Sequence, residues 1–299
     1  MTMAQSSTQT VSIENDKSSK DVPWYSKDMT SQLGAPARDL LERYSKIPAD
    51  EVETHIYSVR DEAWQVFPYP CIGQFRFLDL GISLNPNYET VLERLKTGKE
   101  NFLDLGCCFG QDLRKLAADG APSENLYGVD LRPEFFDMGY KLFRDRELLN
   151  ANFIVADLFD SNSDLHSLNG KVDIISAGSF LHLFNYEGQI DACKVIVRLL
   201  RETAEGSVLI GRQVGSSEAG EVVHHSNPGQ SLFRHNSNSF KKMWEEVGGQ
   251  TPSGLSKWKN MWKHQMSEKR IIGVILSCVS LHLRCSEMLE SRMACVVYA

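Results

Sequence analysis

The chain has 299 residues, of which 42% are hydrophobic and 24% charged, and its formal net charge at pH 7 is −7. This composition is typical of a globular protein and excludes a collagen, a mucin-like stalk and a wholly disordered chain. The net negative charge argues against a nucleic-acid partner, because proteins that bind nucleic acids usually present a basic surface to the phosphates.

The cysteines and the apolar stretches indicate the compartment. Seven cysteines are an odd number and include no C-x-x-C pair, so we predict free thiols in a reducing compartment and no metal site. No secretory signal is visible, and the longest apolar stretch, residues 271–283, is too short to span a bilayer. We therefore expect a cytoplasmic protein without a membrane span, and a homodimer is left open.

The first third of the chain is predicted to be helical. Residues 1–20 are rich in Ser, Thr and Gln and predict a disordered tail. Apolar residues at helical spacing then predict an N-terminal helical cap or lid over residues 21–98. The predicted helices of this cap are 36–47, 48–67, 72–82 and 88–96.

From residue 99 onward short apolar runs alternate with helical stretches, which is typical of a parallel sheet covered on both faces. We predict an α/β fold over residues 99–299, with a Rossmann-like, doubly wound, mostly parallel sheet and an atypical C-terminal segment, 266–299. The predicted strands are 102–105, 126–129, 153–156, 172–176, 208–210 and 293–298, and the predicted helices are 111–118, 133–149 and 187–203. In such folds the ligand binds at the carboxyl ends of the strands.

The most informative pattern is the stretch 102–112, FLDLGCCFGQD, in which a strand runs through a glycine-bearing turn into a helix. Gly106 and Gly110 stand where the backbone must turn tightly or allow a ligand to approach. Asp130 follows Gly110 by 20 residues and ends the next predicted strand. An acid at that position suits the hydroxyls of a ribose.

The residues around this turn favour an adenosyl cofactor that carries positive charge. A dinucleotide site would need glycines where the chain has Cys108 and Gln111, which disfavours an NAD-dependent oxidoreductase. Asp104 would repel a pyrophosphate but attract the sulfonium and amino groups of S-adenosylmethionine. Asp157 ends the third predicted strand, where it can accept from an adenine amino group while the Leu158 backbone N–H donates to a ring nitrogen.

Each acid also has a simpler interpretation. Asp130 alone could cap the helix that begins near Pro133, and Asp157 alone could be a turn residue. Their joint order and spacing favour the cofactor site.

The sequence resembles the class I S-adenosylmethionine-dependent methyltransferases, and within them the small-molecule O-methyltransferases of fungal meroterpenoid pathways. The resemblance covers residues 24 to about 262, and its motifs lie at 24–26, 55–64, 69–73, 102–112, 179–184 and 211–215. It implies cofactor contacts at Asp104, Gly106, Asp130, Asp157 and Leu158. It also implies that the N-terminal helices cover the site, with Tyr25 near the cofactor, and that the reaction is methyl-ester formation on a carboxyl of a polyketide–terpenoid intermediate.

Methyl transfer from a sulfonium is an in-line displacement, so the protein mainly aligns the donor and the acceptor. His182 follows a predicted strand at the face where the acceptor should lie, and it could be a base, a substrate anchor or a structural residue. Arg76, Arg212 and Arg234 are candidate anchors for a carboxylate, because a guanidinium binds a carboxylate with two hydrogen bonds.

Two alternatives remain at this point. The first is a phenolic or hydroxyl O-methyltransferase of the same fold, which would need a base to remove the hydroxyl proton. The second is a non-catalytic module that binds S-adenosylmethionine, because the segment 266–299 departs from the family pattern.

Overall fold

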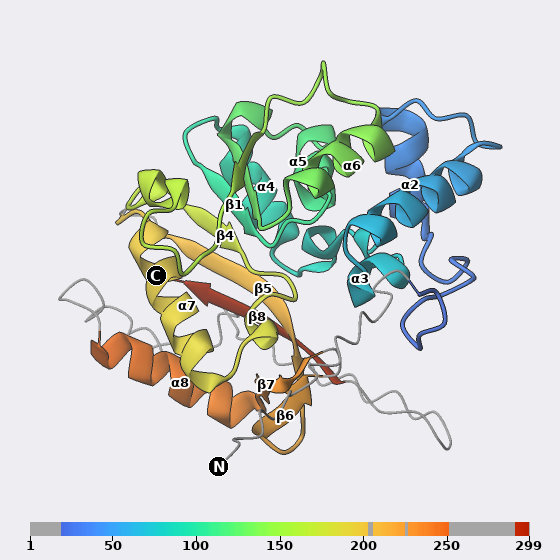
Figure 1. The fold of residues 1–299 in the computed structure, drawn as a ribbon. Coiled ribbons are helices and arrows are strands. Elements are labelled where there is room, and N and C mark those ends of the chain that lie inside the picture. Colours follow the sequence, from blue (N-terminus) through green and yellow to red (C-terminus); the bar gives the residue numbers. More distant parts are fainter. Residues whose placement is uncertain (1–18, 203–205, 225–226, 251–290, 299) are drawn as a thin grey trace, which may run out of the picture.

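The computed structural model describes residues 19–202, 206–224, 227–250 and 291–298 (Figure 1). Nearly all of the predicted disordered tail lies outside these residues. So do the apolar stretch 271–283 and the segment 266–290.

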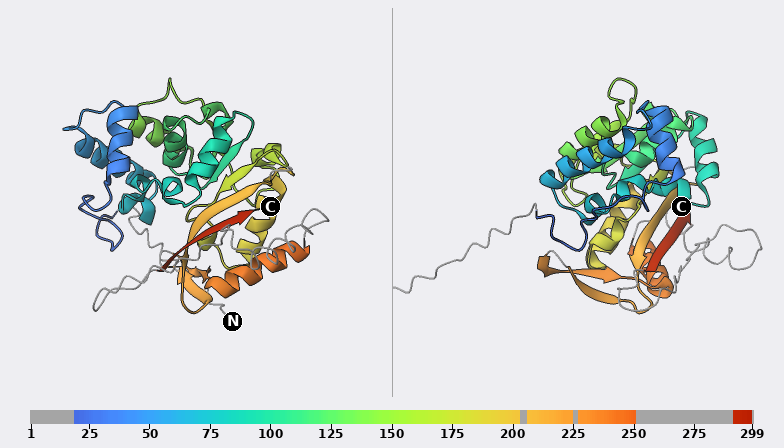
Figure 2. Two further views of the ribbon diagram at one scale, coloured as in Figure 1. Left: turned by 180° about the vertical axis from the view of Figure 1, so that it is seen from behind. Right: turned by 90° about the vertical axis from the view of Figure 1, so that its right-hand side faces the viewer.

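The centre of the fold is a six-stranded sheet in the order β3-β2-β1-β4-β5-β8. The first five of these are parallel, and β8 runs antiparallel to β5 over eight residue pairs (Figure 2). This confirms the predicted Rossmann-like, mostly parallel sheet. The strands are β1 (Phe102–Leu105), β2 (Leu126–Asp130), β3 (Asn152–Val155), β4 (Ile174–Ser176), β5 (Val208–Gly215) and β8 (Ser291–Tyr298).

Neighbouring residues of the central strands are buried on opposite faces of the sheet, because side chains alternate along a strand. Phe102 faces α4 (Tyr88–Lys96) and α5 (Gln111–Ala118), whereas Leu103 faces α7 (Tyr186–Leu199) and α8 (Ser237–Gln250). Ile174 and Ile175 divide between the same two clusters. The continuous apolar runs in the sequence therefore reflect burial on both faces.

Helical segments before β1 pack against α6 (Pro133–Phe143), and the aromatic ring of Phe109 lies in their core. They are α1 (Ala35–Asp39), the π-helix η1 (Leu40–Tyr44), α2 (Val52–Val66), α3 (Pro70–Gly73) and the 3-10 helix η2 (Arg76–Leu78). The 3-10 helix η3 (Gly81–Leu84) packs instead with α4 and α5, through Ile82. The expected helix 72–82 is wrong. Phe75 and Leu80 adopt left-handed backbone angles, with φ of 55° and 45°, and break the segment into short turns.

Other predicted boundaries also change. The helix expected over 133–149 ends at Phe143, because Arg144 is left-handed with φ of 51°. The strand expected over 172–176 begins at Ile174, and Val172 forms only an isolated bridge with Leu200. The strand expected over 208–210 is longer and extends to Gly215.

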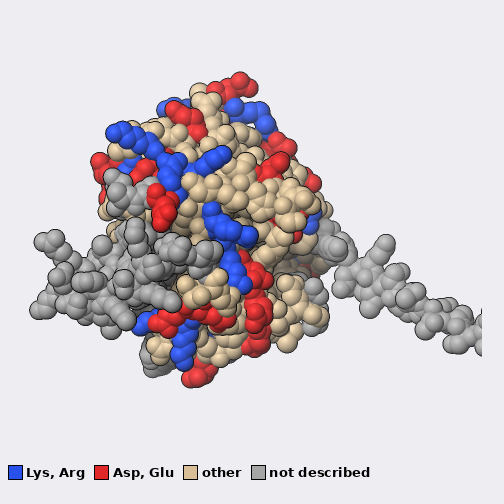
Figure 3. Space-filling view, turned by 90° about the vertical axis from the view of Figure 1, so that its left-hand side faces the viewer, with Lys and Arg blue, Asp and Glu red and all other residues tan. Residues whose placement is uncertain are grey.

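A two-stranded hairpin, β6 (Gly220–His224) and β7 (Asn227–Arg234), was not predicted from the sequence. Its strands follow β5 and precede α8 in the chain. Arg234, the last residue of β7, lies beside His182 at the carboxyl end of the sheet. In the face shown in Figure 3, Lys and Arg side chains are intermixed with Asp and Glu. Within the described ranges, no helix is both long and apolar enough to span a membrane.

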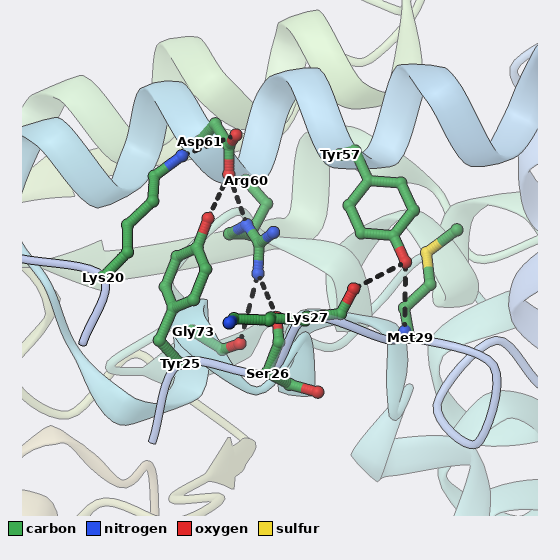
Figure 4. Close-up of polar contacts among 9 residues, drawn as sticks. All are labelled: Lys20, Tyr25, Ser26, Lys27, Met29, Tyr57, Arg60, Asp61 and Gly73. Atoms are coloured by element: carbon green, nitrogen blue, oxygen red, sulfur yellow. Dashed lines mark hydrogen bonds and ion pairs between the residues drawn. The ribbon is translucent and has the colours of Figure 1, made fainter. Parts of the chain in front are cut away.

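The segment before α1 is held against α2 by a buried arginine (Figure 4). Arg60, with 3% exposure, donates to the Ser26 carbonyl at 2.8 Å, and its guanidinium lies 4.2 Å from the ring centroids of Tyr25 and Phe75. Gly73 makes room for the segment, because a Cβ there would lie 2.4 Å from the Trp24 carbonyl oxygen. Residues 22–26 thus form a wall fixed to the cap.

Candidate active site

The turn between β1 and α5 has three left-handed residues at alternate positions. Gly106, Cys108 and Gly110 have φ of 70°, 53° and 64°. The Cys108 backbone N–H donates to Asp130 Oδ2 at 2.9 Å, which ties the turn to the end of β2. A non-glycine residue pays about 1–2 kcal/mol for this backbone conformation. Cys108 therefore adopts a backbone conformation typical of glycine, which only the regular spacing of 106, 108 and 110 could have indicated.

The three predicted acids stand at the carboxyl ends of neighbouring strands. Asp104 lies on β1, Asp130 ends β2, and Asp157 follows β3 by two residues. Asp130 Oδ1 also accepts from the Arg132 N–H at 3.1 Å, and Asp157 Oδ1 from the Phe159 N–H at 2.9 Å. The bond at Asp157 is the turn that its simpler interpretation expected, whereas Asp130 does not cap α6, whose N-cap residue is Arg132. These bonds leave acceptor capacity on both carboxylates, because each has about four lone-pair directions.

Gly106 and Leu158 are closely packed against the protein. A Cβ on Gly106 would lie 2.9 Å from the Phe180 ring, so only glycine fits at this point of the turn. Leu158 is buried. The residues present thus fit S-adenosylmethionine: carboxylates with free acceptor capacity lie at two strand ends, and a buried acid lies on the third strand.

Tyr25 lies on the wall segment of the cap. Its hydroxyl donates to Asp61 Oδ1 at 2.8 Å (Figure 4). Its ring packs edge-on against Trp64, with centroids 4.9 Å apart. These contacts fix the segment, and the expected closeness of Tyr25 to the cofactor stays a prediction.

A buried ion pair holds the backbone of the turn between β1 and α5. Arg114 and Asp145 are 0% and 1% exposed, and two hydrogen bonds of 2.8 and 3.0 Å join them. Arg114 Nη1 donates to the Phe109 carbonyl at 2.6 Å, and the Tyr44 hydroxyl donates to Asp145 at 2.8 Å. The pair thereby connects the turn to η1 of the cap.

His182 lies in a short 3-10 turn after β4. Its ring is held by Gln213 and Val214, near the end of β5. Its Nδ1 is 3.3 Å from both Gln213 Oε1 and the Val214 nitrogen. Gln213 is itself oriented by donating to the Ala177 carbonyl at 3.0 Å. Burial, and then the positive charge of Arg234, lower the pKa of His182 to about 4. The imidazole is therefore neutral at pH 7.

The arginines expected to bind substrate gather near His182. Arg234 donates to the His182 carbonyl at 2.7 Å, and the charges of Arg76 and Arg212 also act on the imidazole. Arg212 pairs with Asp79 of the cap at 2.8 Å. Beside this pair lies a cavity of about 470 Å³, which is lined by Pro23, Ser26, Ser31, Gln32, Gln74, Arg76 and Asp79.

The protonation of His182 can be measured directly. We expect its imidazole resonances to titrate with a midpoint about 4, whereas an exposed histidine titrates near 6.5. Because the folded-state pKa lies below the unfolded one, the unfolded chain binds more protons, so His182 should lower stability as pH falls from about 6.5 towards 4. Histidine-selective NMR of the wild type and His182→Gln would assign the signal, and a midpoint near 6.5 would contradict the described environment.

Comparisons with known proteins agree with this geometry. Residues 24–78 match the family model of the meroterpenoid methyltransferase N-terminal domain, and residues 102–203 match that of a methyltransferase domain. The O-methyltransferase phiE of a fungal species is 48% identical over 235 residues, covering 78% of this chain and 77% of phiE. The asnovolin E/chermesin D methyltransferase nvfJ of Aspergillus novofumigatus is 44% identical over 227 residues, covering 75% of this chain and 80% of nvfJ.

Among solved structures, the N-terminal domain of EvdMO1 with SAH bound aligns at 18% identity with a TM-score of 0.43, over 68% of this chain and 87% of that one. The family matches confirm the predictions of a methyltransferase and of S-adenosylmethionine as its cofactor. With two family matches and relatives more than 40% identical over three quarters of its length, the chain belongs to the fungal meroterpenoid methyltransferases.

Proposed function

We propose that the protein transfers a methyl group from S-adenosylmethionine to a carboxyl oxygen of a small polyketide–terpenoid acid. The observation that carries this proposal is the neutral His182 surrounded by the charges of Arg76, Arg212 and Arg234. A group of arginines beside the carboxyl end of the sheet suits an anionic acceptor, and a guanidinium matches a carboxylate in shape and charge.

The protonation state of the acceptor favours a carboxyl over a phenol. A carboxylic acid is ionised at pH 7, whereas a phenol with a pKa near 10 must lose a proton at a cost of roughly 4 kcal/mol. A histidine whose pKa is about 4 is a weak base for that step. The bound cofactor supplies an activated methyl group, and the chain's own residues orient the acceptor and exclude water.

The cofactor contacts belong to the same proposal. Asp130 would accept from the ribose hydroxyls, Asp157 from the adenine amino group, and the Leu158 N–H would donate to the ring. Asp104 would face the charged amino-acid end, and the turn at Gly106 and Gly110 would let the ligand approach. The support is their placement at three adjacent strand ends.

We also propose a domain organisation for the chain. Residues 21–98 would act as a cap, with Tyr25 on its wall segment, over a catalytic domain spanning 99–299. The relative nvfJ is named for asnovolin E and chermesin D, which favours a small terpenoid acceptor here too. Residence in the cytoplasm and a homodimer stay predictions.

The chemical stability of the product tests the acceptor. The protein, supplied with methyl-labelled S-adenosylmethionine and extracts that contain polyketide–terpenoid acids, should yield a product one CH₂ heavier whose label is released as methanol by mild alkali, because esters are saponified. A label that resists alkali would indicate a phenolic ether instead. That alternative also predicts that His182→Ala loses activity at neutral pH and regains it at high pH, whereas ester formation should show no such rescue.

Binding of S-adenosylmethionine without turnover of any acid or phenol would indicate a non-catalytic module. Arg76→Met is the matched variant for the acceptor site. It should raise the KM for the acid and leave the affinity for the cofactor unchanged.

A further inference from the structure

The first turn of α5 contains a buried carboxylate with an oxygen that lacks a donor. Asp112 is 7% exposed, and its Oδ2 accepts from the Ile82 backbone N–H of the cap at 3.2 Å. Among the residues that the structure describes, none donates a hydrogen bond to its Oδ1. A buried polar atom without a partner loses its hydration without compensation, so this oxygen is suited to a ligand that brings a donor.

A second buried acid lies beside it. Asp104 is 4% exposed on β1, and the charge of Asp112 is the strongest charge acting on it, followed by that of Asp130. Burial and this repulsion raise the pKa of Asp104 well above its usual range. Burial also raises the pKa of Asp112 to about 6. The two carboxyls therefore retain a proton at pH values where an isolated carboxyl is fully ionised.

The described charged groups near the pair do not provide a cation that could bind the two carboxylates. Arg212 of β5 acts favourably on Asp112, but its guanidinium is already bound to Asp79, whose negative charge acts in the opposite direction. The Ser176 side chain on β4 hydrogen-bonds Asp104. Asp104 on β1 and Asp112 on α5 thus form a pair of buried acids, and one oxygen of the pair accepts from no described group.

The order of the strands places this pair at one end of the proposed ligand. Adenine at β3 and ribose at β2 leave the amino-acid end of S-adenosylmethionine at β1, since the sheet runs β3-β2-β1-β4. We propose that Asp112 and Asp104 together bind the ammonium group of the cofactor, and that binding displaces the proton that the two carboxyls share. The inference rests on the proposed cofactor contacts, and it adds Asp112 and a proton to them.

The protons balance in a simple way. Before binding, the pair is one carboxylic acid and one carboxylate. The ammonium arrives with its three N–H donors, both carboxyls become anionic, and one proton is released to the solvent. Affinity should therefore tighten as pH rises while the pair still holds this proton, by up to tenfold per unit, and level off once both carboxyls are ionised in the free protein.

Calorimetry with three ligands tests this on the full chain. S-adenosylmethionine and S-adenosylhomocysteine both carry the ammonium, whereas 5′-methylthioadenosine keeps the adenosine and lacks the amino-acid end. Titrations at pH 6 in buffers of different ionisation enthalpy should show proton release with the first two ligands and none with the third. Absence of release with S-adenosylhomocysteine would overturn the proposal.

Asp112→Asn is the variant of choice, because its amide oxygen can still accept from Ile82. It should weaken both ammonium-bearing ligands about tenfold or more, flatten their pH dependence and leave 5′-methylthioadenosine unchanged. Asp137→Asn, an exposed acid on α6, should change nothing. Equal weakening of all three ligands would show that Asp112 is only structural. If the wild type bound none of the three, the cofactor contacts themselves would be refuted, which is a distinct result.

Discussion

Asp145→Ala should destabilise the protein by about 3–5 kcal/mol, which makes it the largest single effect on stability that we expect. The substitution leaves Arg114 as a fully buried charge without its partner, because Asp145 supplies both carboxylate oxygens to the guanidinium. It also removes the acceptor of the Tyr44 hydroxyl, which joins η1 to the segment after α6.

Urea unfolding followed by circular dichroism would measure this loss. Asp137→Ala is the matched control, since Asp137 pairs with Arg146 at the surface with more than half of each side chain exposed. Exposed pairs contribute about 0–1 kcal/mol, so the control should unfold nearly as the wild type does. A similar small loss for Asp145→Ala would mean that Arg114 keeps its hydration or finds another partner.

The strands of the sheet could be predicted because each is a short apolar run buried on both faces. Phe102–Leu105 and Leu126–Asp130 are long enough for a strand and too short for a typical helix, so their apolar residues indicate strands. The segment 72–82 could not be predicted in the same way. Its apolar residues are buried among the helices that precede β1. Only the left-handed backbone angles at Phe75 and Leu80 divide the segment into turns.

The candidate site also contains residues that local spacing predicts and contacts that it does not. Asp104, Gly106 and Asp130 follow from local spacing, because a strand, a turn and the next strand place them within about 30 residues. The contacts that complete the site join distant positions. Arg212 pairs with Asp79 across 133 residues, and Arg114 pairs with Asp145 across 31. No periodicity in the sequence marks such pairs, and the positive φ of Cys108 is equally invisible there.

The second large effect concerns the cofactor. Asp130→Ala should weaken the binding of S-adenosylhomocysteine by at least tenfold, and by about a hundredfold if both ribose hydroxyls bond to the carboxylate. Hydrogen bonds to a charged acceptor are worth about 1.5–3 kcal/mol. The same carboxylate also holds the Cys108 N–H, so its removal loosens a turn that already has an unfavourable backbone conformation.

Asp130→Asn separates these two contributions. The amide oxygen of asparagine can still accept from Cys108, but it offers no negative charge and fewer acceptor directions to the ribose. If Asp130 binds the ribose, the asparagine variant should lose most of the affinity while its unfolding free energy stays close to that of the wild type. If Asp130 serves only the turn, the asparagine variant should bind as the wild type does, and only the alanine variant should lose both affinity and stability. Calorimetric titration together with urea unfolding of the two variants distinguishes these outcomes.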